Sequence, residues 1–350
     1  MPGSMLTYRY RIKDATSGKH LVRLGWAVNQ VWNFCNEVSM LALRRDHTWL
    51  SMVDLINLCA GASTELGLHS DTISEICREY VTRRIQFKKR RLKWRSRKHS
   101  LGWIPFKARF LTIDGDSIKY LKRRFRFWLS RPITGKVKTG SFTQDARGRW
   151  YVNFQCEVDD PGIPVGTKEI GIDLGLTNQL WCSDMDAPYS RENLTRKHED
   201  ALAMAQRARK KKRVKAIHAR IANCRKDWTH KTTTAIVDRA TLIAVGDVSS
   251  TKLAKTSMAK STYDAGWGQL RTCLEYKAKR LGVVYSEVNE SYSSVTCSDC
   301  GARFGPRGLS ALGVRVWTCV ECGSVHSRDR NAAHNILRCG RATLLGIPRL

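Results

Sequence analysis

The sequence predicts an α/β domain joined to a helical lobe and a β-rich lobe, with a small metal-binding ribbon near the C-terminus. Three changes of sequence pattern predict this division. Residues 21–98 repeat apolar side chains every three or four positions, residues 103–158 form short alternating segments between turn signals, and residues from 168 onward alternate apolar strands with helices. With 42% hydrophobic residues among 350, the chain has enough apolar material for folded domains.

The helical lobe is predicted from the spacing of Val28, Val31 and Cys35, which places these side chains on one face of a helix. It ends in residues 83–98, which contain ten Lys or Arg residues and no acid, with aromatic residues among them. Cations in such a run can hold phosphates while the rings stack on bases or sugars. A solvated helix face is the plainer alternative.

The β-rich lobe is predicted from alternation and turns. Residues 150–158 alternate in the way typical of a half-buried strand, and residues 6–13 are expected to supply the first strand of the same small β-barrel. Asp-Asp-Pro-Gly at 159–162 then predicts a linker.

From residue 168 the pattern predicts alternating strands and helices. Residues 169–175 form an apolar strand with a single central carboxylate, Asp173, and residues 178–182 are expected to return antiparallel to it. The expected elements that follow are a basic helix at 207–239, a strand at 240–248, a helix at 265–280 and a strand at 283–288.

Four cysteines near the C-terminus have the spacing of a structural zinc site. Cys297 and Cys300 form one Cys-x-x-Cys pair, Cys319 and Cys322 form a second, and a glycine follows each pair. Four thiolates complete a zinc tetrahedron and leave no open position, so one Zn²⁺ is expected to be structural. Single histidines are expected to be surface or hydrogen-bonded residues rather than ligands: His218, His230, His326 and His334.

The remaining eight cysteines lack paired spacing and are expected to be reduced thiols, mostly as small buried residues. The N-terminus lacks the pattern of a signal peptide and no long apolar run is present. We therefore expect a soluble protein of the prokaryotic cytosol or nucleoid, without a membrane partner.

The net charge points to nucleic acid as a partner. Lys and Arg number 61 against 31 Asp and Glu, which gives a formal charge of +30. A charge of this size exceeds what solubility requires and suits a protein held against phosphates.

Two carboxylates are placed where chemistry is possible. Asp173 lies inside an apolar strand, where an unpaired acid is costly, and Asp329 begins a predicted helix just after the cysteine pairs. The plainer readings are a hydrogen-bonded structural Asp and a helix N-cap. Two such acids and a third could hold two Mg²⁺ ions about 4 Å apart for phosphodiester hydrolysis.

These motifs, in this order, resemble the TnpB family of transposon-encoded RNA-guided nucleases, which are related to compact type V CRISPR effectors. The resemblance rests on Gly-Ile-Asp-Leu-Gly-Leu at 171–176, the four cysteines, and Arg-Asp-Arg-Asn-Ala-Ala-His-Asn-Ile at 328–336. Tyr-Asp-Ala-Gly-Trp at 263–267 and the basic stretch 207–226 are also similar. The resemblance is strongest over 168–338 and weaker over 6–158.

The resemblance implies an RNase H-like RuvC nuclease domain with an inserted zinc ribbon, a β-barrel wedge domain and a helical recognition lobe. It implies two catalytic Mg²⁺ ions, a guide RNA, target double-stranded DNA, and one or two protein copies on one RNA. Asp173 matches the family's first catalytic Asp, and Asp329 matches its last. The expected domains are 6–20 and 101–160 for the wedge, 21–100 for the recognition lobe, 161–296 and 323–350 for the nuclease domain and tail, and 297–322 for the ribbon.

The sequence departs from the family at the middle catalytic position. Gly246 stands where the family usually has Glu, and glycine cannot bind a metal ion. Asp247 could substitute, but adjacent strand residues point to opposite faces. We favour Glu290, just beyond the next strand, because some relatives resemble this arrangement; Glu287 has the opposite parity and is a weaker candidate. Loss of cleavage is the third reading.

The functions that remain open at this stage are an RNA-guided DNA endonuclease, a nuclease-inactive RNA-guided repressor, and a non-guided nuclease or transposase. In the first, the guide pairs with the target and the protein reads a short flanking DNA motif. Candidate nucleic-acid contacts, chosen by charge and position, are Asn33, Lys88, Arg91, Lys107, Arg213, Arg220, Arg225 and Arg328.

Overall fold

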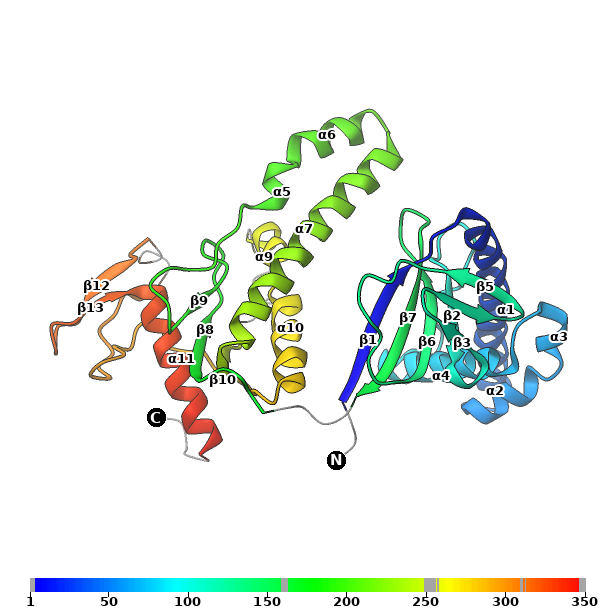
Figure 1. Ribbon diagram of the computed structural model, residues 1–350, viewed down its shortest axis with the longest axis horizontal. Helices are drawn as coiled ribbons and strands as arrows, with labels where there is room; N and C mark the ends of the chain where they lie inside the picture. The colour runs from blue at the N-terminus through cyan, green and yellow to red at the C-terminus, as the bar shows by residue number, and fades with distance from the viewer. Residues whose placement is uncertain are drawn as a thin grey trace. The chain divides into compact units, whose positions relative to one another are not determined.

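The computed structural model describes residues 4–158, 163–248, 256, 258–308, 311 and 313–345. The chain divides into two compact units, Met1–Asp159 and Asp160–Leu350, and each is described by itself (Figure 1). The predicted linker at 159–162 lies outside the described residues. Within the described part, no helix combines the length and apolar character needed to cross a bilayer.

The first unit contains the predicted helices. They are α1 (Ala15–Arg45), α2 (Met52–Leu58), α3 (Ala62–Leu66) and α4 (Ser70–Gln86). Asp14 caps α1 by accepting hydrogen bonds from the backbone nitrogen and the hydroxyl of Ser17, at 2.5 and 2.7 Å. The face predicted from Val28, Val31 and Cys35 is buried, as expected.

The helical pattern ends earlier than the sequence predicts, at Gln86 rather than near Lys98. Two amide side chains of α1 hold the basic segment in a non-helical course. Asn36 pairs with both backbone groups of Leu92 (2.9 and 3.1 Å), and Asn33 pairs with both backbone groups of Arg95 (2.8 Å each). These side chains satisfy the backbone as a neighbouring strand would, so the cations that follow Gln86 do not form a helix face.

Two antiparallel sheets complete the first unit. One has the order β1-β7-β6-β2 and the other β3-β4-β5. A bridge between Ile12 and Phe127 connects them, and both sheets and the helices share one buried core. Residues 150–158 alternate in burial as predicted. The strands are β1 (Ser4–Arg11), β2 (Trp103–Lys107), β3 (Thr112–Asp114), β4 (Ser117–Tyr120), β5 (Arg123–Arg126), β6 (Lys136–Gln144) and β7 (Trp150–Val158), with a 3-10 turn at Ala108–Phe110.

The second unit is organised around a mixed sheet in the order β11-β10-β8-β9. Strands β8 (Lys168–Asp173), β10 (Ala240–Gly246) and β11 (Val284–Val288) are parallel, and β9 (Trp181–Cys182) returns antiparallel to β8 as predicted. The mixed α/β content expected from the sequence is therefore confirmed. The three carboxyl ends of the parallel strands lie at one edge of the sheet.

Helices cover the two faces of this sheet. Ile243 and Val245 share a buried cluster with Leu270 of α10, whereas Ala244 packs with Ile336 of α11 on the other face. Figure 1 shows α7 and α10 on one side of the sheet and α11 on the other. The helices are α5 (Leu194–Lys197), α6 (Glu199–Arg207), α7 (Lys211–Val237), α9 (Ala259–Ala265), α10 (Trp267–Arg280) and α11 (Arg328–Leu344), and the hairpin strands are β12 (Val316–Thr318) and β13 (Val325–Ser327).

Glycine permits a close approach of α11 to the sheet. A Cβ atom on Gly171 of β8 would lie 2.0 Å from the carbonyl oxygen of Ala333, and a Cβ on Gly340 of α11 would lie 2.4 Å from the Cβ of Ala244. Neither position can carry a side chain without moving the helix. The short distance between α11 and the strands β8 and β10 therefore requires glycine at both Gly171 and Gly340.

Candidate carboxylate site and zinc ribbon

Helix α11 brings Asp329 to the end of strand β8. The helix runs antiparallel to the strand, since Arg341 pairs with Glu169 and Ala333 packs against Gly171. Because the two elements are antiparallel, residues earlier in α11 lie beside residues later in β8. The first turn of α11, which contains Asp329, therefore lies near Asp173 at the end of β8. Because Gly171 faces α11 and strand side chains alternate, Asp173 faces α11 as well.

The electrostatics of Asp173 show which acids share its surroundings. Burial of the carboxyl group, followed by the negative charges of Asp329 and Glu290, raises the pKa of Asp173 to about 8. The structure therefore brings together the three acids that the sequence singled out, from a strand, a strand end and a helix start. A strongly perturbed carboxyl group beside other acids, as at Asp173, is typical of functional sites.

Glu290 occupies the place that a side chain at position 246 would need. A Cβ built on Gly246 would lie 2.7 Å from Oε2 and 3.2 Å from Cβ of Glu290, and 3.2 Å from Cδ1 of Ile336. Gly246 pairs with Val288 in the parallel register of β10 and β11, and Glu290 follows Val288 by two residues, so all three have the same parity. Burial, followed by the charge of Asp247, raises the pKa of Glu290 to about 7.

Asp247 and Glu287, the two other acids considered for the middle position, are both exposed to solvent. Asp247 is exposed, donates its backbone N–H to Val288 (2.9 Å) and accepts a hydrogen bond from the backbone nitrogen of Glu290 (3.2 Å). Its geometry is that of a brace for the turn that carries Glu290. Glu287 is exposed and pairs with Arg271 of α10 at 3.4 Å, on the side away from α11.

Asp329 has two partners that the sequence pattern does not identify. The side-chain amide of Asn178 donates to Oδ2 of Asp329 at 3.2 Å, and Arg315 lies 3.3 Å from Oδ1. The pattern marks Asn178 only as the start of the returning strand, and Arg315 has no signal in the sequence. Both orient the Asp329 carboxylate, and Arg315 also places a positive charge beside the acids.

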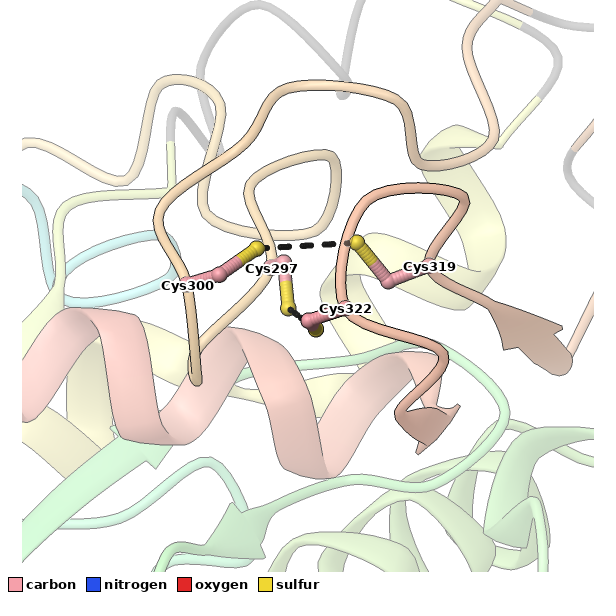
Figure 2. A group of neighbouring side chains, drawn as sticks. All are labelled: Cys297, Cys300, Cys319 and Cys322. Carbon is pink, nitrogen blue, oxygen red and sulfur yellow. Dashed lines mark hydrogen bonds between the residues drawn. The ribbon is translucent and has the colours of Figure 1, made fainter.

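The four cysteines converge as predicted. All four Sγ atoms lie within 4.8 Å of one another, with 3.7 Å between Cys297 and Cys322 and 3.6 Å between Cys300 and Cys319 (Figure 2). Tetrahedral zinc with bonds of about 2.3 Å places its sulfur ligands about 3.8 Å apart. The donor set and its spacing therefore fit one Zn²⁺ ion.

Each half of the ribbon is a turn of the same design. Gly301 donates to the carbonyl of Cys297 (3.0 Å), and Gly323 donates to the carbonyl of Cys319 (2.9 Å). Both glycines have positive φ, 83° and 72°, which explains why a glycine follows each pair. His326 lies beside the four cysteines, and its Nε2 is 3.0 Å from Sγ of Cys297, a hydrogen-bonding distance.

Asparagines of α11 fasten the ribbon to the helix that carries Asp329. The side chain of Asn331 accepts from the backbone nitrogen of Ser298 (2.8 Å) and donates to the carbonyl of Thr296 (2.8 Å). Asn335, one turn later, donates to the same carbonyl at 2.7 Å. The ribbon thereby fixes the start of α11.

Four of the residues predicted to contact nucleic acid are exposed: Lys88, Arg91, Arg213 and Arg220. Arg91 lies 5.5 Å from the ring centre of Trp94, a cation–aromatic pair of the kind expected for this segment. Arg213 and Arg220 lie on α7, at the exposed margin of the face whose Ile217 and Ile221 are buried against α6.

The other four have partners within the protein. Asn33 holds the backbone of Arg95, Lys107 pairs with Glu75 at 3.4 Å, Arg225 binds Asp264 at 2.7 Å, and Arg328 donates to the carbonyl of Ala311 at 2.7 Å. A direct contact of these four with nucleic acid stays a prediction.

Asp264 is a buried acid whose role the sequence did not reveal. Its carboxylate accepts hydrogen bonds from Arg225 (2.7 Å), the hydroxyl of Thr195 (2.8 Å), the backbone of Leu194 (3.1 Å) and Arg191 (3.4 Å). Burial opposes ionisation, but these donors outweigh it and lower the pKa of Asp264. This network joins α5, α7 and α9 at one point.

Comparison with known proteins identifies two family models between residues 153 and 336. Residues 153–257 match the model described as "Probable transposase", and residues 267–336 match "Cas12f1-like, TNB domain". Both models lie over the segment that carries the carboxylates and the ribbon.

Individual relatives agree with these models. A protein of Streptomyces pristinaespiralis named as an RNA-guided DNA endonuclease is 34% identical over 61% of this chain and 56% of its own length. InsQ of Escherichia coli, named in the same way, is 29% identical over 63% of this chain and 60% of its length. The CRISPR-associated endodeoxyribonuclease Cas12f1 of Sulfoacidibacillus thermotolerans is 26% identical over 59% and 55%.

These matches define a class of transposon-associated and CRISPR-associated proteins. The resemblance to the TnpB family that the motifs indicate is confirmed: the chain is similar to Cas12f1 and to a protein named as TnpB-like. The chain spans a little over half the length of the curated relatives that it matches.

Proposed function

We propose that this protein is an RNA-guided DNA endonuclease that uses a guide RNA and a short flanking DNA motif to find its target and cuts by two-metal phosphodiester hydrolysis. The names of the relatives support the RNA-guided nuclease activity. The formal charge of +30 supports nucleic acid as the partner.

The observation that carries the proposal is the position of Glu290 against Gly246. The family's missing middle carboxylate leaves a space at the end of β10, and the side chain of Glu290 fills it from the neighbouring strand. A nuclease that had lost its middle ligand would have no reason to bury a second acid facing Asp173. The proposed ligands are therefore Asp173, Glu290 and Asp329.

The oxygen ligands that these acids offer are those that Mg²⁺ prefers. In the described part of the chain, their oxygens do not all come within 4.8 Å of one another, whereas the ribbon sulfurs do. Two Mg²⁺ ions about 4 Å apart, each about 2.1 Å from its oxygen ligands, need a wider arrangement than one ion. When bound, Mg²⁺ would activate a water molecule and stabilise the leaving oxygen.

The chain's own residues would position this chemistry. Asn178 and Arg315 hold the Asp329 carboxylate, Asp247 braces the backbone of Glu290, and the ribbon fixes the start of α11. The strand order of the second unit supports its assignment as an RNase H-like RuvC domain, and its basic helix α7 is the proposed surface for the nucleic-acid backbone. The first unit would form the recognition lobe and wedge.

RNA guidance is tested by purifying the protein from cells that carry its native locus, without nuclease treatment, and sequencing RNA that survives a high-salt wash. One abundant RNA with a constant scaffold and a variable end is the expected result. Heterogeneous fragments, or no RNA while the locus is transcribed, would favour a non-guided nuclease or transposase.

Catalysis is tested with the guide so obtained and a matching DNA target in Mg²⁺. Replacing Glu290 by Ala or Gln is expected to lower the cleavage rate at least about 1,000-fold while RNA binding persists, because the middle metal ligand is removed. Glu287→Ala is the matched control, an acid three residues earlier that should leave the rate within about twofold. Undiminished cutting by Glu290→Ala would rule out the relocated ligand. No cutting by the wild type, with RNA and target bound, would favour the repressor.

A further inference from the structure

Three cysteines of the first unit converge although their spacing shows no motif. The Sγ atoms of Cys35, Cys59 and Cys77 all lie within 4.8 Å of one another, and those of Cys35 and Cys77 are 3.8 Å apart. All three are buried, with exposed fractions of 0%, 6% and 0%. In the described residues, this group and the ribbon are the two sets of potential metal ligands that come this close.

The three thiols come from three different elements. Cys35 lies on the buried face of α1, Cys59 caps the C-terminal end of α2, and Cys77 lies on the buried face of α4. Leu55 is the single buried side chain that α2 itself provides. A bond at Cys59 would therefore fasten a seven-residue helix whose other core contacts, Met52 and Ile56, are only partly buried.

The geometry fits a metal site and excludes a disulfide. A disulfide needs sulfur atoms about 2.05 Å apart, whereas the 3.8 Å between Cys35 and Cys77 is a contact distance close to the separation expected for two sulfurs on one zinc ion. The ribbon has the same spacing, 3.6 to 3.7 Å. The described residues thus contain two cysteine clusters with similar sulfur separations. The sequence motif predicts the ribbon cluster, whereas no motif predicts the cluster of Cys35, Cys59 and Cys77.

A third thiol argues against chance packing of small residues. Cysteine is common in cores, and Cys156 is an example in the same unit, fully buried in β7 and outside the group. Thiols are weak hydrogen-bond donors and weak acceptors, so three thiols that contact one another stabilise the core little through hydrogen bonds. Three thiolates around a soft cation satisfy every sulfur.

We propose that Cys35, Cys59 and Cys77 bind one thiophilic metal ion that fastens α2 to α1 and α4. Zn²⁺ and Cu⁺ share the required chemistry. Three thiolates leave a net charge of −1 around Zn²⁺ and −2 around Cu⁺, so Zn²⁺ is the better occupant of an apolar core, with its fourth ligand supplied from outside the three thiols. The ion enters as the lobe folds and is then held out of reach of solvent. The site is structural and does not depend on the nuclease activity proposed above.

The first test is the metal content of the full chain, purified under reducing conditions and dialysed against EDTA, with zinc and copper measured by mass spectrometry. The wild type is expected to retain one ion per chain more than Cys59→Ser. Cys156→Ser, a substitution of an equally buried cysteine outside the group, should match the wild type. An equal metal content in the wild type and Cys59→Ser, while Cys300→Ser loses metal, would overturn the proposal. Copper in place of zinc would correct the identity of the ion and retain the site.

A second measurement leaves the first unit unaltered, so it does not depend on how well Cys59→Ser folds. In a variant with Cys300 and Cys319 both replaced by Ser, the ribbon cannot form its site, and any tightly held zinc belongs elsewhere. X-ray absorption of this variant is expected to show three sulfur neighbours at about 2.3 Å. Absence of bound metal from this variant, in a sample whose first unit melts as in the wild type, would overturn the proposal.

Discussion

The ribbon and the carboxylate site are two sets of candidate metal ligands built in opposite ways. The ribbon's ligands come from two tight turns, each closed by its own backbone hydrogen bond and a glycine of positive φ. The acids come from the end of β8, the residue beyond β11 and the first turn of α11, and only the packing of those elements brings them together.

This difference decides what each site can tolerate. A local turn fixes both the ligand and its position in sequence, so a ribbon cysteine has no substitute elsewhere. A tertiary site fixes only a position in space, and any neighbouring element that reaches it can supply the side chain. Glu290 beside Gly246 is an example, because adjacent parallel strands with matched parity end at the same point.

The largest expected effect comes from breaking the local site. Cys319→Ser should release the zinc and unfold the ribbon, lowering the melting temperature of the second unit by about 10 °C. The first unit should melt as before, which calorimetry of the full chain would resolve. Cys224→Ser, at an exposed cysteine on α7, is the control and should change neither transition. An unchanged second-unit transition in zinc-free Cys319→Ser would show that α11 does not depend on the ribbon.

The tertiary network at Asp264 should come next. Asp264→Asn leaves Arg191 and Arg225 without their charged partner and should cost about 3 kcal/mol at pH 7 in urea unfolding. The folded pKa of Asp264 is lowered, so its contribution is complete above the unfolded value of about 3.9 and is lost as the pH falls below it. Wild type and variant should therefore converge in stability in acid.

An exposed ion pair supplies the control for this prediction. Asp227 pairs with Lys231 one turn away on α7 at 2.8 Å, with both side chains largely in solvent. Asp227→Asn should change stability by less than about 0.5 kcal/mol. Equal effects of the two substitutions would mean that the Asp264 network does not stabilise the fold beyond an ordinary surface pair.

A smaller effect is expected from moving the middle acid back to its usual position. Gly246→Glu alone should slow cleavage 10- to 100-fold, about 1.4 to 2.7 kcal/mol, because its Cβ would meet Glu290 and Ile336. Combined with Glu290→Ala, it should cut at least about tenfold faster than Glu290→Ala alone. Gly246→Gln with Glu290→Ala has the same bulk without the charge and should not recover. If the double variant with Gly246→Glu cut no faster than the one with Gly246→Gln, the middle ligand would lie elsewhere.

The smallest expected effect is a gain in stability at the acids themselves. In EDTA, Asp173→Asn removes a carboxyl group that is partly ionised at pH 8 and whose charge is opposed by burial and by the charges of Asp329 and Glu290, so the melting temperature at pH 8 should rise by about 3 °C. Asp186→Asn, at an exposed acid paired with Arg330, should shift it by less than about 1 °C. A fall in melting temperature for Asp173→Asn would indicate that Asp173 is a structural acceptor.

Much of the local structure follows from sequence patterns. The alternation of residues 150–158, the antiparallel return of residues 181–182 and the helix beginning near Asp329 all appear as predicted. The prediction that the basic segment is helical was wrong after Gln86. Asn33 and Asn36 hold this segment in a non-helical course, and they lie 56 to 62 positions before the backbone groups that they bind, so a local sequence pattern does not reveal the contact.

The sequence by itself determined that the four ribbon cysteines lie in two matched turns and that Asp173 and Asp329 lie at the ends of elements, since periodicity and tight turns are properties of neighbouring residues. Only the tertiary structure decided that Glu290 fills the space beside Gly246, that Asp264 gathers its donors, and that Cys35, Cys59 and Cys77 meet. Each of these depends on how separate elements pack, and packing brings together residues whose separation along the chain has no fixed value.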